Sequence, residues 1–495
     1  MATYMESLEF IRGQSGEADT KGLSLDDIGK FIKEDESLAF VVIEAEKRFR
    51  SLGAEEMKVA KLSEVDAVAY LQKDIVNFYP ALQVNPYVAL AAKGPWIITL
   101  HGAVIHDSGG YGMLGFGHSP DVIEKSLSGG QVIANVMTAN LAQAKACGML
   151  KQEVGRSREQ GCPYTKFLFM NSGSESVTVA ARIADLNAKV RTDTGGSHAG
   201  MKIKIAAHVG GFHGRTERPS QASDSTRRAN LNLASFRDRD ELLTVEPNNL
   251  ESLRAAFEQA KADGVFIEML FMEPVMGEGN PGLAISPEYY GEARRLTREN
   301  GTLFLIDSIQ AGLRACGALS IVDYPGFEGM DPPDFETYSK ALNAGQYPLS
   351  VLAMTEATAA LYLCGIYGNT MTTNPRALDV ACAVLSSLTP ELRVNIQNRG
   401  REFLAKFDEL MAEFPEAVTG VSGTGLLCAL HLNPAGYRVV GESGIEIFMR
   451  HMGIGVIHGG KNALRFTPHF RISSKEIDLI IEKIRSALLR GPVYS

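Results

Sequence analysis

Residues 167–189 read FLFMNSGSESVTVAARIADLNAK. The four apolar residues at the start predict a short strand, and the residues from Ser174 onward predict an amphipathic helix. Between them lies the small polar turn Asn171 to Glu175. Such a turn presents backbone N–H groups and hydroxyls at the positive end of a helix, which suits a phosphate group. The same residue types also occur simply as helix caps, so the turn alone does not decide between the two interpretations.

Strands and helices continue to alternate on the carboxyl side of this turn. Strands are expected at residues 202–209, 265–272 and 302–306, and helices at 174–189, 250–262 and 287–300. This alternation predicts an α/β fold, with a mainly parallel sheet that carries helices on both faces. Asp307 directly follows the strand 302–306, and ligands in such sheets bind outside the carboxyl ends of the strands. We therefore expect Asp307 in a site, unless it only forms a turn.

Two further segments are candidates for the same edge of the sheet. Lys340 lies between apolar residues in the stretch YSKAL, although an isolated lysine is usually a solvated surface charge. Residues 211–216, GFHGRT, follow the strand 202–209. An aromatic ring, an imidazole and a guanidinium in one glycine-rich loop can stack on a ring and bind an anion.

The composition is that of a large globular protein. The 495 residues are 45% hydrophobic and 22% charged, which excludes disorder as the main state. The net charge of −9 disfavours a general nucleic-acid or anionic-membrane binder. No uninterrupted apolar run approaches the length of a membrane-spanning helix, and the first residues lack the basic and apolar regions of a signal peptide.

The cysteine and histidine residues predict neither a disulfide framework nor a metal site. The six cysteines are widely scattered and form no C-x-x-C pair, which favours reduced thiols in a cytoplasmic compartment. The ten histidines show no spacing typical of zinc ligands. We therefore expect a cytoplasmic protein without a bound metal.

Changes in composition and in secondary-structure pattern along the chain predict three segments. Residues 1–90 read as an acidic, helical N-terminal extension. Residues 91–372 carry the alternating strands and helices of a large domain. Residues 373–495 read as a small α+β domain, which closes on a helix that Ser473 and Glu476 cap.

The order of these features resembles the class III aminotransferases of the ornithine and 4-aminobutyrate type, which bind pyridoxal 5′-phosphate on a fold type I scaffold. The matching stretches are NSGSE at 171–175, FHGRT at 212–216, EPVMGEG at 273–279, DSIQ at 307–310, PD at 333–334, SK at 339–340 and NP at 374–375. The resemblance implies a large domain with a mainly parallel seven-stranded sheet, a small α+β C-terminal domain, and pyridoxal phosphate as the cofactor.

The resemblance also implies roles for the residues around the cofactor. Lys340 is implied to form the Schiff base with the cofactor aldehyde and then to move a proton as a free amine. Asp307 is implied to pair with the pyridine nitrogen and keep it protonated. The other implied contacts are Ser172, Gly173 and Ser174 at the phosphate, Phe212 and Ile309 on the two ring faces, and Gln310 at the ring's 3′-oxygen. His213 and Gly214 match positions in the loop and receive no chemical step.

A threonine four residues before the Asn374-Pro375 pair reaches, in this family, the phosphate of the neighbouring subunit. That position is Thr370 in this sequence. The resemblance therefore implies a homodimer with active sites at the subunit interface.

Three charged residues are implied to choose the substrates. Arg465 matches the arginine that binds the carboxylate of an amino acid or a 2-oxo acid. Glu278 matches the glutamate that covers this arginine when an ω-amine donor is bound, and Arg215 matches an arginine used for the far carboxylate. The implied reaction moves an amino group from an ω-amino acid, such as lysine, ornithine or 4-aminobutyrate, to a 2-oxo acid, in the first place 2-oxoglutarate.

The sequence departs from the family pattern at several places, two of which lie in the motifs nearest the site. Ser308 stands where the family's Asp-Glu-Val-Gln motif has an acidic residue, and Asn280-Pro281 is inserted after the Glu273 motif. Two alternatives therefore stay open. One is an amino-acid racemase or 2,1-aminomutase on the same scaffold, and the other is a non-catalytic protein of the same fold.

Overall fold

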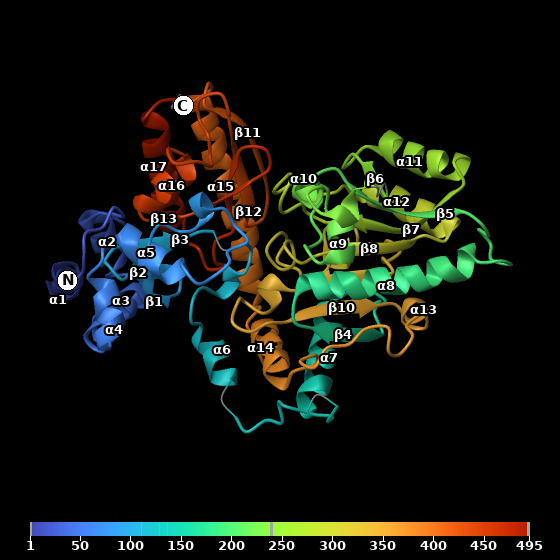
Figure 1. The fold of residues 1–495 in the computed structure, drawn as a ribbon, viewed down its shortest axis with the longest axis horizontal. Helices are drawn as coiled ribbons and strands as arrows, with labels where there is room; N and C mark the ends of the chain where they lie inside the picture. Colours follow the sequence, from blue (N-terminus) through green and yellow to red (C-terminus); the bar gives the residue numbers. More distant parts are fainter. Residues whose placement is uncertain (1, 110, 128, 136, 238–240, 493–495) are drawn as a thin grey trace. The chain divides into compact units, whose positions relative to one another are not determined.

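The computed structural model describes residues 2–109, 111–127, 129–135, 137–237 and 241–492 (Figure 1). The chain forms two compact units. The sheet unit comprises Val122–Gln397 and Gly423–Leu427, and the terminal unit comprises Met1–Asp121, Asn398–Ser422 and Cys428–Ser495.

A seven-stranded sheet is the frame of the sheet unit, counted over the described residues. Its strands, in spatial order, are β4 (Lys166–Met170), β10 (Ser350–Met354), β9 (Phe335–Tyr338), β8 (Leu303–Asp307), β7 (Val265–Met272), β5 (Lys202–His208) and β6 (Leu242–Val245). Neighbours from β6 to β9 are parallel, whereas β10 is antiparallel to both β9 and β4. The predicted α/β fold with a mainly parallel seven-stranded sheet is confirmed.

Helices precede, connect and follow these strands along the chain. They are α6 (Asp121–Ser126), α7 (Leu141–Glu153), α8 (Gly173–Thr192), α9 (Glu217–Ala222), α10 (Arg227–Asn230), α11 (Leu250–Ala262), α12 (Pro287–Asn300), α13 (Glu356–Ala359), α14 (Pro375–Ser386) and α15 (Pro390–Glu413), the first and last of which cross into the terminal unit.

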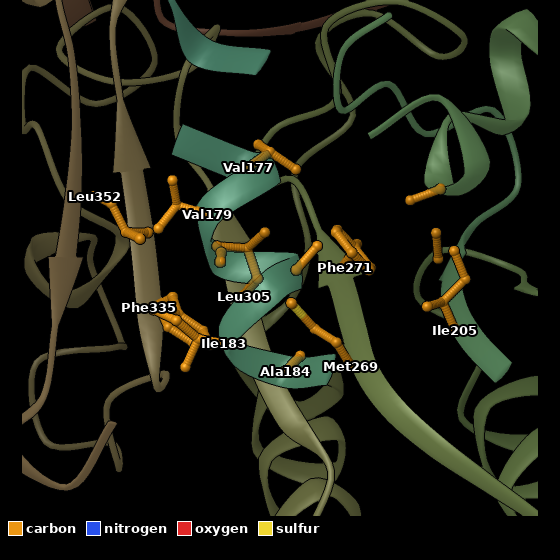
Figure 2. Close-up of a cluster of buried hydrophobic side chains, with 14 of the residues drawn as sticks. Val177, Val179, Ile183, Ala184, Ile205, Met269, Phe271, Leu305, Phe335 and Leu352 are labelled. Carbon is orange, nitrogen blue, oxygen red and sulfur yellow. The ribbon is translucent and has the colours of Figure 1, made fainter. Parts of the chain in front are cut away.

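The core of the sheet unit lies between α8 and the strands (Figure 2). Val177, Val179 and Ile183 of α8 are fully buried against apolar side chains of the central strands. Phe271 and Leu305 are among these strand residues, and both are fully buried as well. Burial of large apolar side chains is worth about 1.5–3 kcal/mol each, so this contact fixes where α8 begins relative to the sheet edge.

The terminal unit combines helices from the start of the chain with strands and helices from its end. Its helices are α1 (Ala2–Gln14), α2 (Leu25–Phe31), α3 (Glu36–Arg50), α4 (Ala54–Ala60), α5 (Glu64–Gln72), α16 (Ile445–His451) and α17 (Ser474–Leu489). One sheet has the order β1 (Ala89–Lys93), β2 (Trp96–Thr99), β3 (Val104–Asp107), β13 (Ile454–Gly455), and the other has the order β11 (Val418–Thr424), β12 (Leu427–Leu432), β15 (Ala463–Phe466), β14 (Ile457–Gly459).

Two contacts explain why the two ends of the chain share one unit. The buried ammonium group of Lys483 on α17 lies 2.8 Å from a carboxylate oxygen of Asp27 on α2. In addition, β13 pairs in parallel with β3, with Ile454 opposite His106. The unit boundaries therefore cut across the predicted segments 1–90, 91–372 and 373–495, and that division stays a prediction about folding units.

Within the described residues, no helix is both long enough and apolar enough to cross a lipid bilayer.

Candidate active site

The structure brings the predicted cofactor residues of the sheet unit to one edge of the sheet. Because β5, β7, β8 and β9 are parallel and β4 runs in the same direction, their carboxyl ends meet at this edge. The segments that leave it are 171–175 after β4, 209–216 after β5, 273–278 after β7, 307–310 at the end of β8, and 339–340 after β9.

Asp307 is held in a fixed orientation at the end of β8. Its side chain is buried, with 3% exposure. His213 donates from Nδ1 to one carboxylate oxygen at 2.9 Å, and the Thr337 hydroxyl and the Ile309 N–H donate to the other, each at 3.2 Å. The imidazole of His213 therefore pairs with Asp307, a role that was not predicted for this histidine. The signal that could have found it is a histidine in the loop that leaves the strand two positions away from β8.

Lys340 lies two residues after the end of β9 and begins a single 3₁₀ turn, Lys340–Leu342. Its φ of +33° lies in the left-handed region, which costs about 1–3 kcal/mol for a residue other than glycine. Neighbouring hydrogen bonds hold this turn, because Ser339 and Asn343 both donate to the carbonyl of Leu349, at 2.7 and 2.8 Å. These hydrogen bonds hold the backbone of Lys340 in its strained conformation.

The turn after β4 forms the start of α8. Ser172 is the N-cap, and its hydroxyl accepts from the N–H of Glu175, whose side chain in turn accepts from the N–H of Ser172. Gly173 is the first helical residue, and a Cβ at this position would overlap the side chain of Ile309. Ser174 accepts a hydrogen bond from the N–H of Arg215 at 3.3 Å, so the loop after β5 lies against the helix start.

These groups fit pyridoxal phosphate. An amine, a buried carboxylate and the positive end of a 20-residue helix converge on one sheet edge. Phe212 and Ile309 are half-buried there, and either side chain offers an apolar face to a planar ring. Gln310 is buried and packs so closely on Gly277 that no Cβ would fit at position 277.

Glu273 is a further residue of this edge that the sequence analysis did not single out as functional. Its carboxylate is 2% exposed and accepts the backbone N–H groups of Phe212, at 3.0 Å, and of Gly277, at 2.9 Å. Glu273 thereby joins the aromatic loop after β5 to the loop that carries Glu278. Burial raises the pKa of Glu273 to about 7; the charge of Asp307 adds to this, and His213 opposes it.

Ser308 stands where the family motif has an acidic residue, and the structure supplies a carboxylate to it from the neighbouring strand. The Ser308 hydroxyl donates to Glu336 of β9 at 2.5 Å. Glu336 is fully buried. The side chain at 308 is therefore part of an internal hydrogen-bond network.

The predicted substrate residues lie in both units. Glu278 and Arg215 belong to the sheet unit, where Glu278 is half-buried and Arg215 is exposed. Arg465 belongs to β15 of the terminal unit and is fully buried. Its guanidinium carbon lies 5.3 Å from the centre of the Tyr111 ring. The contact between Glu278 and Arg465 stays a prediction.

Thr370 is exposed in the segment 367–372, which follows α13. Its neighbour Asn369 donates to Glu175 at 3.2 Å, so the segment lies beside the turn of its own chain. The contact of Thr370 with the phosphate of a partner subunit stays a prediction.

Comparisons with known proteins identify the family of this chain. The family model of class III aminotransferases matches residues 79–488. The chain is 28% identical to ornithine aminotransferase 2 of Staphylococcus saprophyticus over 429 residues, which are 83% of this chain and 97% of the relative. It is 30% identical to ornithine aminotransferase 2 of Staphylococcus aureus over 328 residues, which are 65% of this chain and 74% of the relative.

The fold is also that of solved aminotransferases. The crystal structure of ornithine aminotransferase from Toxoplasma gondii ME49 superposes with a TM-score of 0.73 at 21% identity, over 88% of this chain and 97% of that one. The chain belongs to the class III aminotransferase family. It is a pyridoxal-phosphate-dependent transaminase, with an amino acid and a 2-oxo acid as its classes of substrate.

Proposed function

We propose that this transaminase moves the terminal amino group of an ω-amino acid of the lysine, ornithine or 4-aminobutyrate type to 2-oxoglutarate. The observation that carries this proposal is Arg465, a fully buried guanidinium on β15 that is suited to a substrate carboxylate. Both curated relatives described above are named ornithine aminotransferases, which supports an ω-amine donor.

When bound, pyridoxal phosphate supplies a ring that withdraws electrons from the substrate carbon that loses its proton. Lys340 would carry the cofactor and, once displaced by substrate, would take this proton and return it with its free amine. Asp307 would hold a proton at the ring nitrogen, and His213 keeps the Asp307 carboxylate in place. Gly173 and Ser174 would hold the phosphate at the start of α8, with Ser172 beside them.

The remaining cofactor contacts follow the same edge. Phe212 and Ile309 would cover the two faces of the ring, and Gln310 would donate to its 3′-oxygen. None of these three side chains needs a proton transfer for its role, so each would orient the ring.

Arg465 would bind the carboxylate of 2-oxoglutarate with two parallel hydrogen bonds, and Arg215 would bind its far carboxylate. Glu278 would pair with Arg465 when the donor presents a terminal amine and no carboxylate at that place. A buried guanidinium beside an apolar chain is costly without a counter-charge. Arg465 would therefore pair either with a substrate carboxylate or with Glu278.

We also propose a homodimer in which Thr370 reaches the partner's phosphate. Support comes from large apolar side chains that the sheet unit leaves exposed, since burying exposed apolar surface favours association. They include Val132, Met137, Leu141, Leu361, Leu363 and Met371. All six cysteines are free thiols, which supports a reducing compartment such as the cytoplasm.

The test times the two half-reactions separately by stopped-flow absorbance of the cofactor, with ornithine, lysine and 4-aminobutyrate as donors and 2-oxoglutarate or pyruvate as acceptors. Arg465→Ala should slow the 2-oxoglutarate half-reaction far more than the donor half-reaction. Glu278→Ala should do the reverse. Arg471→Ala, which removes an exposed arginine of the same unit, is the control.

Equal losses in both half-reactions for both variants would contradict the switch between Glu278 and Arg465. Turnover in the absence of any oxo acid would instead identify a racemase or aminomutase. A protein that binds the cofactor but reacts with no amino donor would favour the non-catalytic alternative.

A further inference from the structure

We propose that Glu175 is a positioning residue that joins the phosphate turn of one subunit to the segment that carries Thr370, and thereby couples the two cofactor sites of the dimer. This inference rests on the proposed homodimer. It concerns a residue that neither touches the reacting atoms nor received a role from the sequence.

The Glu175 carboxylate accepts hydrogen bonds on both of its oxygens. Oε2 accepts the backbone N–H groups of Asn171, at 2.8 Å, and of Ser172, at 3.0 Å. Oε1 accepts the Tyr367 hydroxyl at 2.9 Å and the Asn369 side-chain amide at 3.2 Å. An ionised carboxylate has about four acceptor positions, so these donors use its full capacity.

One oxygen therefore serves the phosphate turn, and the other serves the segment 367–372. Further hydrogen bonds join the same two elements. The Asn171 side chain donates to Asn369 at 3.1 Å, and the Thr372 hydroxyl donates to the carbonyl of Phe169 at the end of β4.

Thr370 lies between these attachment points. Asn369 precedes it and Thr372 follows it, and both are bonded to the turn or to β4. Thr370 itself is exposed. Its backbone is thus fixed relative to the phosphate turn of its own chain, while its side chain is available to a second subunit.

The negative charge of Glu175 affects phosphate binding at the start of α8. A carboxylate in the first turn of α8 would repel a phosphate at the helix start if its charge were not taken up elsewhere. Four donors to Glu175 take up this charge, and two of them come from the segment that carries Thr370. Cofactor binding in one subunit should therefore favour the bonded position of this segment, which is the position that presents Thr370 to the partner. Coupling of this kind is reciprocal between the two sites.

The test is an equilibrium titration of the full-length apoenzyme with pyridoxal phosphate, followed by the absorbance of the bound cofactor. Tyr367→Phe removes one hydroxyl donor and leaves the N-cap of α8 unchanged. We expect its dissociation constant for the cofactor to rise by about five- to tenfold, which is less than the full effect of one lost hydrogen bond to a charged group because this bond acts on the phosphate only through Glu175. Tyr70→Phe removes an exposed hydroxyl on α5 and should leave the constant unchanged.

Thr370→Val separates this inference from the proposed dimer contact. The inference predicts that Tyr367→Phe adds little in a Thr370→Val background, because both changes interrupt the same connection. An unchanged dissociation constant in Tyr367→Phe, together with a raised one in Thr370→Val, would overturn the coupling and leave the dimer contact standing. An unchanged constant in Thr370→Val would overturn the dimer contact, and with it the coupling between sites.

Discussion

Asp307 and Glu336 are buried carboxylates on the neighbouring strands β8 and β9, yet their partners differ. In the register of the two strands, Asp307 lies opposite Thr337 and Glu336 lies opposite Ile306. Successive side chains of a strand point to opposite faces of the sheet. Asp307 shares a face of the sheet with Thr337, its partner in the register. Glu336 precedes Thr337 in β9, so its side chain lies on the opposite face.

Among the described residues, the hydrogen-bond partners of Glu336 are all neutral. The hydroxyls of Tyr164 and Tyr338 donate to it at 2.8 and 2.9 Å, and the N–H of Ile321 donates at 2.9 Å. Ser308, at 2.5 Å, and Ser320 complete the set. Asp307, in contrast, has the imidazole of His213 as a partner and ends its strand at the site. We infer that Glu336 serves stability, whereas Asp307 keeps its predicted role at the cofactor.

Asp307→Asn should produce the largest effect on rate. The side chain stays similar in size, but the charge that would hold a proton at the cofactor nitrogen is lost. We expect kcat/KM to fall by an amount equal to about 3–5 kcal/mol in the activation barrier, with a nearly unchanged melting temperature. Steady-state kinetics and thermal unfolding of the same preparation measure both quantities. A rate close to that of the unmodified enzyme would show that the carboxylate has another role.

Glu336→Ala should show the opposite pattern. Several buried donors would lose their acceptor, and one unsatisfied buried group costs about 1–3 kcal/mol. We expect the free energy of unfolding in urea to fall by about 3 kcal/mol. Glu336→Gln, which keeps one acceptor oxygen, should lose less. A Glu336→Ala protein with unchanged stability and reduced activity would contradict the structural role.

Glu273 extends the comparison to a carboxylate whose partners are backbone amides. Its pKa of about 7 lies above the value of 4.5 in the unfolded chain. Between these values the folded protein retains a proton that the unfolded chain has lost, so the free energy of unfolding should decrease as the pH rises from 4.5 to 7. Glu273→Gln should remove this part of the pH dependence. Urea unfolding at several pH values measures it, and an unchanged slope in the variant would contradict the assignment.

Glu476 has two histidine partners and should behave in the opposite way. His106 and His469 lie 3.0 and 2.8 Å from one of its oxygens. Although burial opposes it, the charge of His469 and the two hydrogen bonds hold the pKa of Glu476 well below 4.5. Its contribution to stability should therefore be present above pH 4.5 and decrease as the pH falls below that value. Glu476→Gln should make the acid limb of the stability curve shallower, and a curve identical to the original would contradict this reading.

The sequence predicted the frame of this site because its signals are local. A few consecutive residues are enough to recognise the strand that ends at Asp307. The same holds for the turn before α8 and for the lysine after β9. Partners far apart in sequence were not predictable in this way. His213 meets Asp307, and Glu336 meets Ser308, only because the sheet places β5, β8 and β9 as it does. The strand β13 has only two residues, which is too short a pattern to predict its pairing with β3.

The proposed active site depends most directly on Lys340 as the residue that carries the cofactor. The decisive measurement is borohydride reduction of the yellow holoenzyme, followed by proteolysis and mass spectrometry of the peptides. We expect a pyridoxyl group on Lys340, and no labelled peptide from a Lys340→Ala protein that melts at the same temperature as the unmodified enzyme. A pyridoxyl group on any other lysine of the unmodified enzyme would contradict the proposed site.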